Sequence, residues 1–347
     1  MALLTKRRFV VQLAVCLAVL GALIVVSPGI GTQDVGIGDA WRALVADDPD
    51  PVVYGIAWTL RFPRTMKALI AGFTLALCGA IFQTLFRNPL ATPYTVGIAS
   101  GASLGALIAY RLKWVAPVLG LSSVSLCAFA GALVVLLLVL ALARSSARIT
   151  GNTLLLAGVT IGFFCSGMMI FLTSLADVKE THTTVRWLMG SLDTFGAVEI
   201  RALVPIVVPA WLILLCLSRG LNQFEVGAEI AATRGVNVNR LEVVGIVVGA
   251  LAVAAIVSMC GPIGFVGLII PHLTRLLTGR DHRVLLPAAA LLGAAFLITC
   301  DFLTTMAPAW YGALAGRETT TARLPIGVMT AILGTPIFLV MLCTRRK

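Results

Sequence analysis

The side chains that most often do chemistry in proteins are few here and poorly grouped. The chain of 347 residues holds three histidines, His182, His272 and His282, and none belongs to an HExxH metalloprotease motif. Its eight cysteines lie in apolar stretches without a CxxC pair, which favours helix packing over metal or redox chemistry. The sequence also shows neither paired carboxylates nor a nucleophile paired with a base. We therefore predict no metal site, no resident cofactor and no catalytic centre.

The charged residues do not indicate a built-in source of energy either. A GxxxxGK[ST] phosphate loop is absent and no lysine follows a glycine, so the chain is not expected to bind ATP itself. Ion-coupled transporters carry ionisable residues near the membrane midplane. Here Lys67, His272 and Asp301 fall near the ends of the apolar runs. A self-contained ion-coupled transporter is therefore kept only as an alternative class, and a membrane enzyme ranks below it.

The composition indicates a membrane protein. Of the residues, 59% are hydrophobic and 12% charged, and the mean hydropathy is +1.01. A soluble domain is about 45–50% apolar and about 25% charged. The net charge of +11 comes from single basic residues and short clusters between apolar runs, which excludes a stripe that follows a nucleic acid backbone. The partner of this charge is expected to be membrane lipid.

The apolar runs predict an all-α polytopic fold with about ten transmembrane helices in one domain over residues 1–347. The crossings are expected at 9–26, 65–86, 95–110, 115–142, 152–172, 200–218, 241–260, 262–279, 285–303 and 325–343. Basic clusters at 6–8 and 345–347 place both termini in the cytosol, and this topology puts the whole net charge of +11 on the inner side. The longer connections are an external segment at about 28–63, a cytosolic loop at about 219–240 and an external loop at about 304–324. An amphipathic helix capped by Asp39 is expected over 39–45.

Two breaks in the apolar pattern favour a transporter. Residues 87–93 contain two prolines, and residues 260–267 contain three glycines and a proline. A helix interrupted at membrane depth must be buried in protein or line a cavity, because its freed backbone groups need partners. Independent turns in an unrelated bundle are the alternative. The doubled GxxxG spacing at 97–105 predicts close helix packing.

The cytosolic loop contains a segment suited to a partner protein. Residues 224–236 read as a short amphipathic helix that ends at a glycine, and such a helix can lie in a groove of another protein. A solvated connecting loop is the alternative interpretation.

At this point an ordered set of motifs resembles a known family. The segment GAEIAATRGV at 227–236 is similar to the coupling loop of ABC importer permeases. Over about residues 55–343 the chain resembles the FecCD/BtuC-like permeases of type II ABC importers, which carry iron-siderophores, haem or cobalamin. The motifs are RFPR (61–64), GAIFQ (79–83), NPLATP (88–93), GIASGA (97–102), LAG (156–158), RWLMGS (186–191), GPIGFVGLIIPH (261–272), DHR (281–283) and LPIG (324–327).

The resemblance implies a permease subunit in a bacterial-type cytoplasmic membrane. Such permeases pair as homodimers or with a similar second subunit. Two ABC ATPase subunits bind ATP and Mg on the cytosolic side, and a periplasmic or lipoprotein substrate-binding protein delivers the chelate from outside. A ferric siderophore is the first expectation for the substrate because many members carry iron chelates, with cobalamin and haem as the alternatives.

The resemblance also assigns candidate residues to three sites. The ATPase-coupling loop would span 220–238, with Gly227, Glu229, Ala231, Ala232 and Gly235. The binding protein would dock at Arg61 and Arg64; the further arginine that the family has after the aspartate at 301 is missing here, and Arg317 or Arg323 could replace it. The cytosolic gate would include Asn88, Leu90, Thr150 and Asn152. The plainer readings are membrane-anchoring arginines and a simple Asn-Pro turn.

Overall fold

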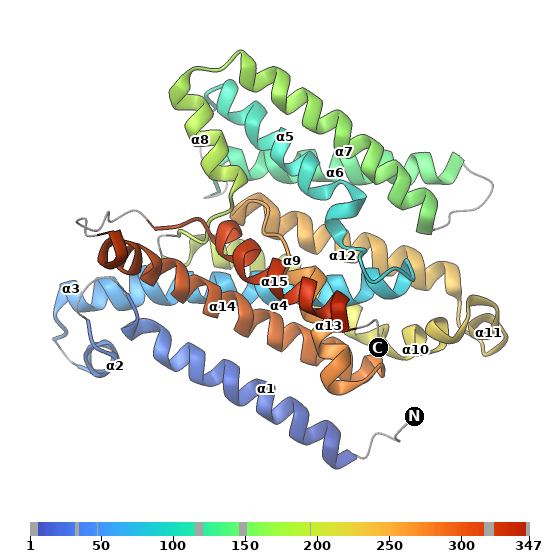
Figure 1. Ribbon diagram of the computed structural model, residues 1–347, viewed down its shortest axis with the longest axis horizontal. Helices are drawn as coiled ribbons and strands as arrows, with labels where there is room; N and C mark the ends of the chain where they lie inside the picture. Colours follow the sequence, from blue (N-terminus) through green and yellow to red (C-terminus); the bar gives the residue numbers. More distant parts are fainter. Residues whose placement is uncertain are drawn as a thin grey trace.

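The computed structural model is a bundle of helices (Figure 1), and it describes residues 6–31, 35–46, 48–114, 121–145, 151–194, 196–315 and 323–344. Each predicted crossing coincides with a helix. These are α1 Lys6–Val26, α4 Phe62–Leu85, α5 Ile98–Arg111, α6 Ser123–Ser145, α7 Gly151–Ser174, α9 Val198–Cys216, α12 Val238–Cys260, α13 Val266–Thr278, α14 His282–Ala315 and α15 Ile326–Thr344. The all-helical polytopic fold predicted from the sequence is therefore confirmed.

Shorter helices connect the long ones. They are the 3-10 turns Ser27–Gly29 and Pro93–Val96, α2 Ile37–Val45, α3 Pro51–Tyr54, α8 Val178–Leu188, α10 Ser218–Val226 and α11 Ala228–Thr233. Helices α2, α3 and α8 lie towards one end of the bundle and α10 and α11 towards the other (Figure 1), so we refer to the α3 end and the α11 end.

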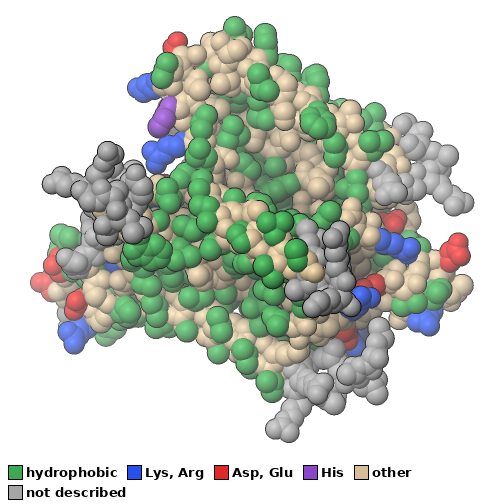
Figure 2. All heavy atoms as spheres, in the orientation of Figure 1, with side chains coloured by type: hydrophobic (Ala, Val, Ile, Leu, Met, Phe, Trp, Pro, Cys, Tyr) green, Lys and Arg blue, Asp and Glu red, His purple; other side chains and the backbone are tan. Residues whose placement is uncertain are grey.

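The surface between these two ends is apolar. Figure 2 shows charged side chains gathered at the ends of the bundle and hydrophobic ones over the band between them. On α7, for example, Phe163 and Ile170 are 75% and 72% exposed. Among the described residues, seven helices are long and apolar enough to cross a membrane, and α13 and α15 are shorter apolar helices. A large exposed apolar belt is unfavourable in water, so the chain is a membrane protein.

Two of the predicted connections are partly helical. The expected external segment 28–63 becomes helical at Pro51, and α3, a turn with i to i+5 hydrogen bonds at Gly55–Arg61 and α4 run on without a break to Leu85. The expected loop 304–324 is helical up to Ala315, because α14 continues through Pro308. In a sequence, proline indicates the end of a helix. In the folded protein, packing against other helices lets the helix continue through the proline.

The amphipathic helix expected over 39–45 is present, but its predicted cap is wrong. Helix α2 begins after Gly36, whose carbonyl accepts a hydrogen bond from the Ala40 N–H at 3.0 Å. Asp39 lies in the first turn instead, where a carboxylate is favourable near the positive end of the helix. The helix is held on the bundle by Trp58, whose Nε1 donates to the Ala40 carbonyl at 2.8 Å.

Helix α4 is the centre of the bundle and contacts α9, α12, α13 and α14. Glycines permit these contacts, since a Cβ added to Gly72 would lie 2.3 Å from the Gly293 carbonyl oxygen and one added to Gly79 would lie 2.0 Å from that of Gly267. Between α5 and α6, a Cβ at Gly105 would lie 2.1 Å from the Cys127 carbonyl. Close backbone approach replaces the hydrophobic drive that is missing between helices in lipid.

The two predicted breaks meet inside the protein. Between α12 and α13 the chain turns at Gly261, which has a φ of +68°, and Ile263 loses its helical partners. The Tyr94 hydroxyl, from the turn after the first break, donates to the Ile263 carbonyl at 2.9 Å and accepts from its N–H at 3.1 Å. The freed backbone groups of one break are thus satisfied by a residue of the other.

Candidate coupling and docking sites

A group of charged side chains is packed into the α3 end of the bundle, and we call it the ion cluster. It comprises Arg64 and Lys67 of α4, Asp193 after α8, Glu199 of α9 and Asp301 of α14. The Arg64 guanidinium donates to both oxygens of Asp301, from Nε at 2.8 and 3.0 Å and from Nη2 at 2.7 Å, and also contacts Asp193. Lys67 Nζ donates to Glu199 at 2.5 Å and to the Asp193 carbonyl at 3.1 Å.

The ion cluster runs from the interior to the surface. The side chains of Arg64 and Asp301 are 8% and 6% exposed, whereas that of Asp193 is 61% exposed. Burial favours the neutral acid, but the charge of Arg64 and hydrogen bonds from Arg64 and Ser191 outweigh it and lower the pKa of Asp193. Asp301 is therefore the interior partner of Arg64, and Asp193 is a partner that solvent can reach.

Arg61 is also buried, but it binds the backbone. Its Nη1 donates to the carbonyls of Pro28 at 2.9 Å and Val35 at 3.3 Å, which ties the segment after α1 to the start of α4. Partial loss of hydration and the positive charge of Arg64 lower the pKa of Arg323, which places this exposed arginine beside the ion cluster. Arg317 lies outside the described residues.

The predicted coupling loop consists of two short helices, α10 and α11, joined at Gly227; we call residues 218–235 the α10–α11 segment. Glu229 and Ala232 are exposed on α11, while Ala231 is buried. The segment ends at Gly235, where a φ of +82° turns the chain back so that the Val236 N–H reaches the Ala231 carbonyl at 3.0 Å. The prediction of an amphipathic helix ended by glycine is confirmed, with the difference that Gly227 divides it.

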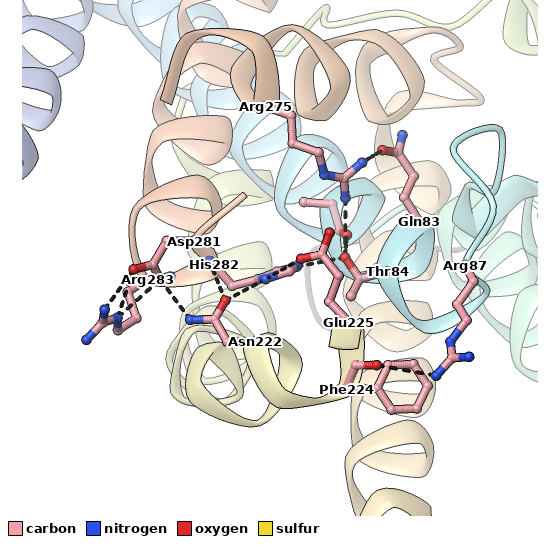
Figure 3. Close-up of polar contacts among 11 residues, drawn as sticks. Gln83, Thr84, Arg87, Asn222, Phe224, Glu225, Arg275, Asp281, His282 and Arg283 are labelled. Carbon is pink, nitrogen blue, oxygen red and sulfur yellow. Dashed lines mark hydrogen bonds and ion pairs between the residues drawn. The ribbon is translucent and has the colours of Figure 1, made fainter. Parts of the chain in front are cut away.

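Polar contacts connect α10 to α14, and through α14 to α4 and α13, at the α11 end (Figure 3). The His282 ring is fully buried and lies between Thr84 of α4, 2.8 Å from Nε2, and Asn222 of α10, 2.9 Å from Nδ1. The Asn222 amide also accepts from the His282 backbone N–H at 2.8 Å and donates to Asp281 at 2.8 Å. Arg275 of α13 completes the group, donating to Gln83 at 3.0 Å and Thr84 at 3.3 Å. We call these six residues the junction network.

The Asp281 carboxylate, at the end of the junction network, is stabilised in its ionised form. Hydrogen bonds from the Arg283 guanidinium, together with those from Asn222 and the Arg283 backbone, outweigh burial and lower the pKa of Asp281 to about 2. Asp281 also caps α14, because its carboxylate accepts from the Arg283 N–H at 3.0 Å. It is therefore ionised at neutral pH.

The first predicted gate loop is a compact turn next to this network. Asn88 Oδ1 accepts from the Leu90 N–H at 2.9 Å, as expected for an asparagine that satisfies freed backbone, and the Leu90 side chain is 51% exposed. Arg87 extends to α10, where Nη2 donates to the Phe224 carbonyl at 3.3 Å and the guanidinium lies 4.9 Å from the centroid of the Phe224 ring. The turn at 87–92 is thus connected directly to the α10–α11 segment.

The second predicted gate loop is only partly visible. Thr150 lies outside the described residues, and Asn152 belongs to the first turn of α7. Gly151 packs against Phe86 at the end of α4, since a Cβ there would lie 2.9 Å from the Phe86 ring. The start of α7 and the 87–92 turn are therefore neighbours.

Sequence reasoning missed both polar groups as units. Lys67 and Asp301 were placed near the ends of crossings, but Asp193 and Glu199 were not linked to them, and Thr84 and Asn222 were not singled out. The DHR run at 281–283 was the available signal for the junction network, because a charged tripeptide between two apolar helices needs partners. Among the described residues, no group of three or more His, Cys, Asp or Glu could hold a metal ion.

A broken-helix bundle with an apolar belt, buried polar clusters and a pair of short exposed helices is the architecture of a membrane permease. The profile of the FecCD transport family matches residues 17–344, and the chain belongs to that family of ABC importer permeases.

Similar proteins agree with this assignment. The chain is 38% identical over 315 residues to the cobalamin import system permease protein BtuC of Halobacterium salinarum, covering 89% of this chain and 80% of that protein. It is 35% identical over 351 residues to the vitamin B12 import system permease protein BtuC of Shigella boydii, covering 99% and 98%. A solved structure described as an inward-facing metal-chelate type ABC transporter superposes with a TM-score of 0.79, at 28% identity over 96% of this chain and 99% of that one.

Proposed function

We propose that this chain is the membrane subunit of an ATP-driven importer that carries cobalamin across a bacterial-type cytoplasmic membrane. Two similar permeases are named for cobalamin or vitamin B12 import, which moves cobalamin ahead of the ferric siderophore expected from the sequence. Haem and ferric siderophores stay as alternatives. The absence of a phosphate loop in the sequence means that ATP and Mg would be bound by a partner ATPase.

The observation that carries the proposal is the α10–α11 segment. It presents exposed side chains, including Val226 and Ile230, yet α10 is fastened to the core of the bundle by Asn222. An exposed helix pair with a rigid connection to membrane helices is suited to receive a displacement from a docked protein. The α11 end would then face the cytosol and the α3 end the exterior, with both termini cytosolic.

Docking of a binding protein is proposed at the α3 end, around Arg61, Arg64 and Arg323, with Arg317 in the adjoining loop. Since Arg61 and Arg64 are buried, a partner carboxylate would have to replace the exposed Asp193 on Arg64 or bind Arg323. The gate is proposed at Asn88 and Leu90, with Thr150 and with Asn152 at the start of α7. A second copy of the chain would complete the pathway as a homodimer.

Reconstitution with its ATPase and binding protein tests the function. The chain in liposomes, supplied with loaded binding protein and ATP, should accumulate labelled cobalamin, whereas labelled haem or ferric siderophore should not enter. Preferential uptake of either alternative would overturn the cobalamin assignment. If no ATPase co-purifies with the chain, or if a proton or sodium gradient alone drives uptake, the importer proposal itself is wrong.

A charge reversal tests the role of the α10–α11 segment. Glu229→Lys should abolish the stimulation of ATP hydrolysis by loaded binding protein while the isolated ATPase stays active, because the change falls on the exposed face of α11. Lys179→Glu, a reversal at an exposed position on α8, is the control and should leave the stimulation intact. Unchanged coupling in Glu229→Lys would contradict the proposal.

A further inference from the structure

The junction network is a directional chain of hydrogen bonds. Asn222 Oδ1 already accepts from the His282 backbone N–H, and Asn222 Nδ2 donates to Asp281, so Oδ1 can only accept from the ring as well. The hydrogen of the neutral imidazole therefore lies on Nδ1, an assignment that follows from the partners and not from observed hydrogens. Nε2 is then an acceptor.

Thr84 supplies the donor for Nε2. Its hydroxyl has two acceptors in reach, the Ala80 carbonyl at 2.9 Å and His282 Nε2 at 2.8 Å. The Ala80 carbonyl already accepts the helical N–H of Thr84, whereas Nε2 is enclosed and depends on this hydroxyl. Arg275 in turn donates to the Thr84 oxygen at 3.3 Å.

Donation therefore runs one way, from the Arg275 cation through Thr84, His282 and Asn222 to the Asp281 anion. Each bond polarises the next, so such a chain is stronger than its separate bonds. Its members come from α13, α4, α14, α10 and the loop between α13 and α14. Asn222 links the chain to the α10–α11 segment, and Glu225 of the same segment lies 3.6 Å from His282 Nδ1.

The residues of α4 in the junction network also hold the backbone of the 87–92 turn. The Gln83 carbonyl accepts from the Asn88 N–H at 3.2 Å, and the Thr84 carbonyl accepts from the Arg87 N–H at 3.2 Å. The turn is thus built directly on the two α4 residues that the junction network holds. The contact of Arg87 with Phe224 is a second link, two residues along α10 from Asn222.

We propose that the Thr84–His282–Asn222 joint fixes α10 to the end of α4, so that a displacement of the α10–α11 segment moves the 87–92 turn instead of being absorbed by sliding of α10. The inference rests on the proposed importer function. Thr84, His282 and Asn222 act here as positioning residues, and they transmit motion because their bonds are directional and the His282 ring between them is buried.

Two threonines provide a matched test. The hydroxyls of Thr84 and Thr278 both lie within hydrogen-bond distance of the carbonyl four residues earlier, at 2.9 and 3.0 Å, but only that of Thr84 also contacts His282. In the reconstituted importer, Thr84→Val and Asn222→Ala should lower substrate transported per ATP hydrolysed by about tenfold or more, within the range of allosteric coupling. Thr278→Val should change it less than about twofold. His282→Gln, which keeps one donor and one acceptor, should retain more coupling than His282→Ala.

Spin labels at Leu90 and Ala232, both exposed, report the motion itself. When a non-hydrolysable ATP analogue binds the wild-type complex, both labels should shift relative to a label at Lys179. In Thr84→Val and Asn222→Ala the label at Ala232 should still shift, and the label at Leu90 should shift much less than in the wild type, with the Arg87–Phe224 contact as the remaining link. Because Thr84→Val and Asn222→Ala cut the same chain, the double variant should be no worse than the poorer single variant.

The outcomes separate the joint from the importer function. If the wild type neither binds an ATPase nor shows a nucleotide-dependent shift, the proposed function is wrong. If the wild type couples normally, and Thr84→Val and Asn222→Ala keep both the transport ratio and the shift at Leu90, the joint is wrong and the importer function stands. A variant that no longer folds is replaced by Asn222→Asp, which still accepts from His282 but opposes Asp281 and should also uncouple.

Discussion

The two ends of α4 carry polar clusters of different construction. At the α3 end, Arg64 and Asp301 are full charges paired inside the bundle, and the four helices and loops that meet there are held at short distances. At the α11 end, two ions terminate a chain whose central members, Thr84, His282 and Asn222, are uncharged. Loss of one partner leaves a buried charge in the first cluster and one unmade hydrogen bond in the second. The ion cluster therefore suits a rigid framework, and the junction network suits an element that moves.

The largest effect on stability is expected at the buried pair. Asp301→Asn leaves the Arg64 guanidinium in the interior with only an exposed counter-ion, and removal of one partner of a buried pair costs about 3–5 kcal/mol. Thermal or chemical unfolding of the purified protein in detergent measures the loss. Asp193→Asn is the control: it makes the same change at the exposed partner of Arg64 and should cost less than about 1 kcal/mol. Equal losses of stability in the two variants would contradict the assignment of Asp301 as the buried partner and Asp193 as the solvent-exposed partner of Arg64.

A smaller loss is expected at the second pair of the ion cluster. Lys67→Met keeps the volume of a fully buried side chain and leaves Glu199, which is 36% exposed and can be hydrated. We expect a cost of about 1–2 kcal/mol, mainly from the hydrogen bond lost at the Asp193 carbonyl. The same unfolding assay measures it, and a loss as large as that of Asp301→Asn would mean that Glu199 is isolated from solvent.

In the junction network, stability and function should separate. Thr84→Val removes one neutral donor and should lower stability by only about 1 kcal/mol, close to the effect of Thr278→Val. Transport per ATP should nevertheless fall in Thr84→Val alone. Unfolding and coupling measured on the same preparations test this contrast. A destabilisation as large as that at Asp301 would place the network with the rigid framework instead.

The smallest effect concerns pH at Asp281. Its pKa is lowered to about 2 from an ordinary value of 3.8, so the carboxylate stabilises the folded state above about pH 4, and this contribution is lost as the pH falls towards 2. Asp281→Asn should lower the unfolding midpoint slightly at pH 7, equally at pH 5, and not at all near pH 2. Because Arg283 is 59% exposed, the contribution should stay below about 1 kcal/mol. If the difference in unfolding midpoint between Asp281→Asn and the wild type grew as the pH fell, the pKa of Asp281 would be raised by folding and not lowered.

The fold was predictable to the extent that it depends on local composition. Each apolar run predicted as a crossing lies in a helix, and glycine spacing at 101 and 105 identified a real close contact. Helices extend beyond two of the predicted crossings, over 51–63 and 304–315, since tertiary packing offsets the local cost of proline. The α10–α11 segment was found from its own pattern, because helix ends and exposed faces are local properties.

The sequence by itself determined that this chain is a helical membrane permease, with its breaks at 87–93 and 260–267 and its family motifs in order. Only the tertiary structure decided which polar residues act together. Arg64 meets Asp301 across 237 positions, and Thr84 meets His282 across 198. In an apolar bundle each buried polar group must find a partner, and the partner is chosen by how the helices pack, which no local pattern records.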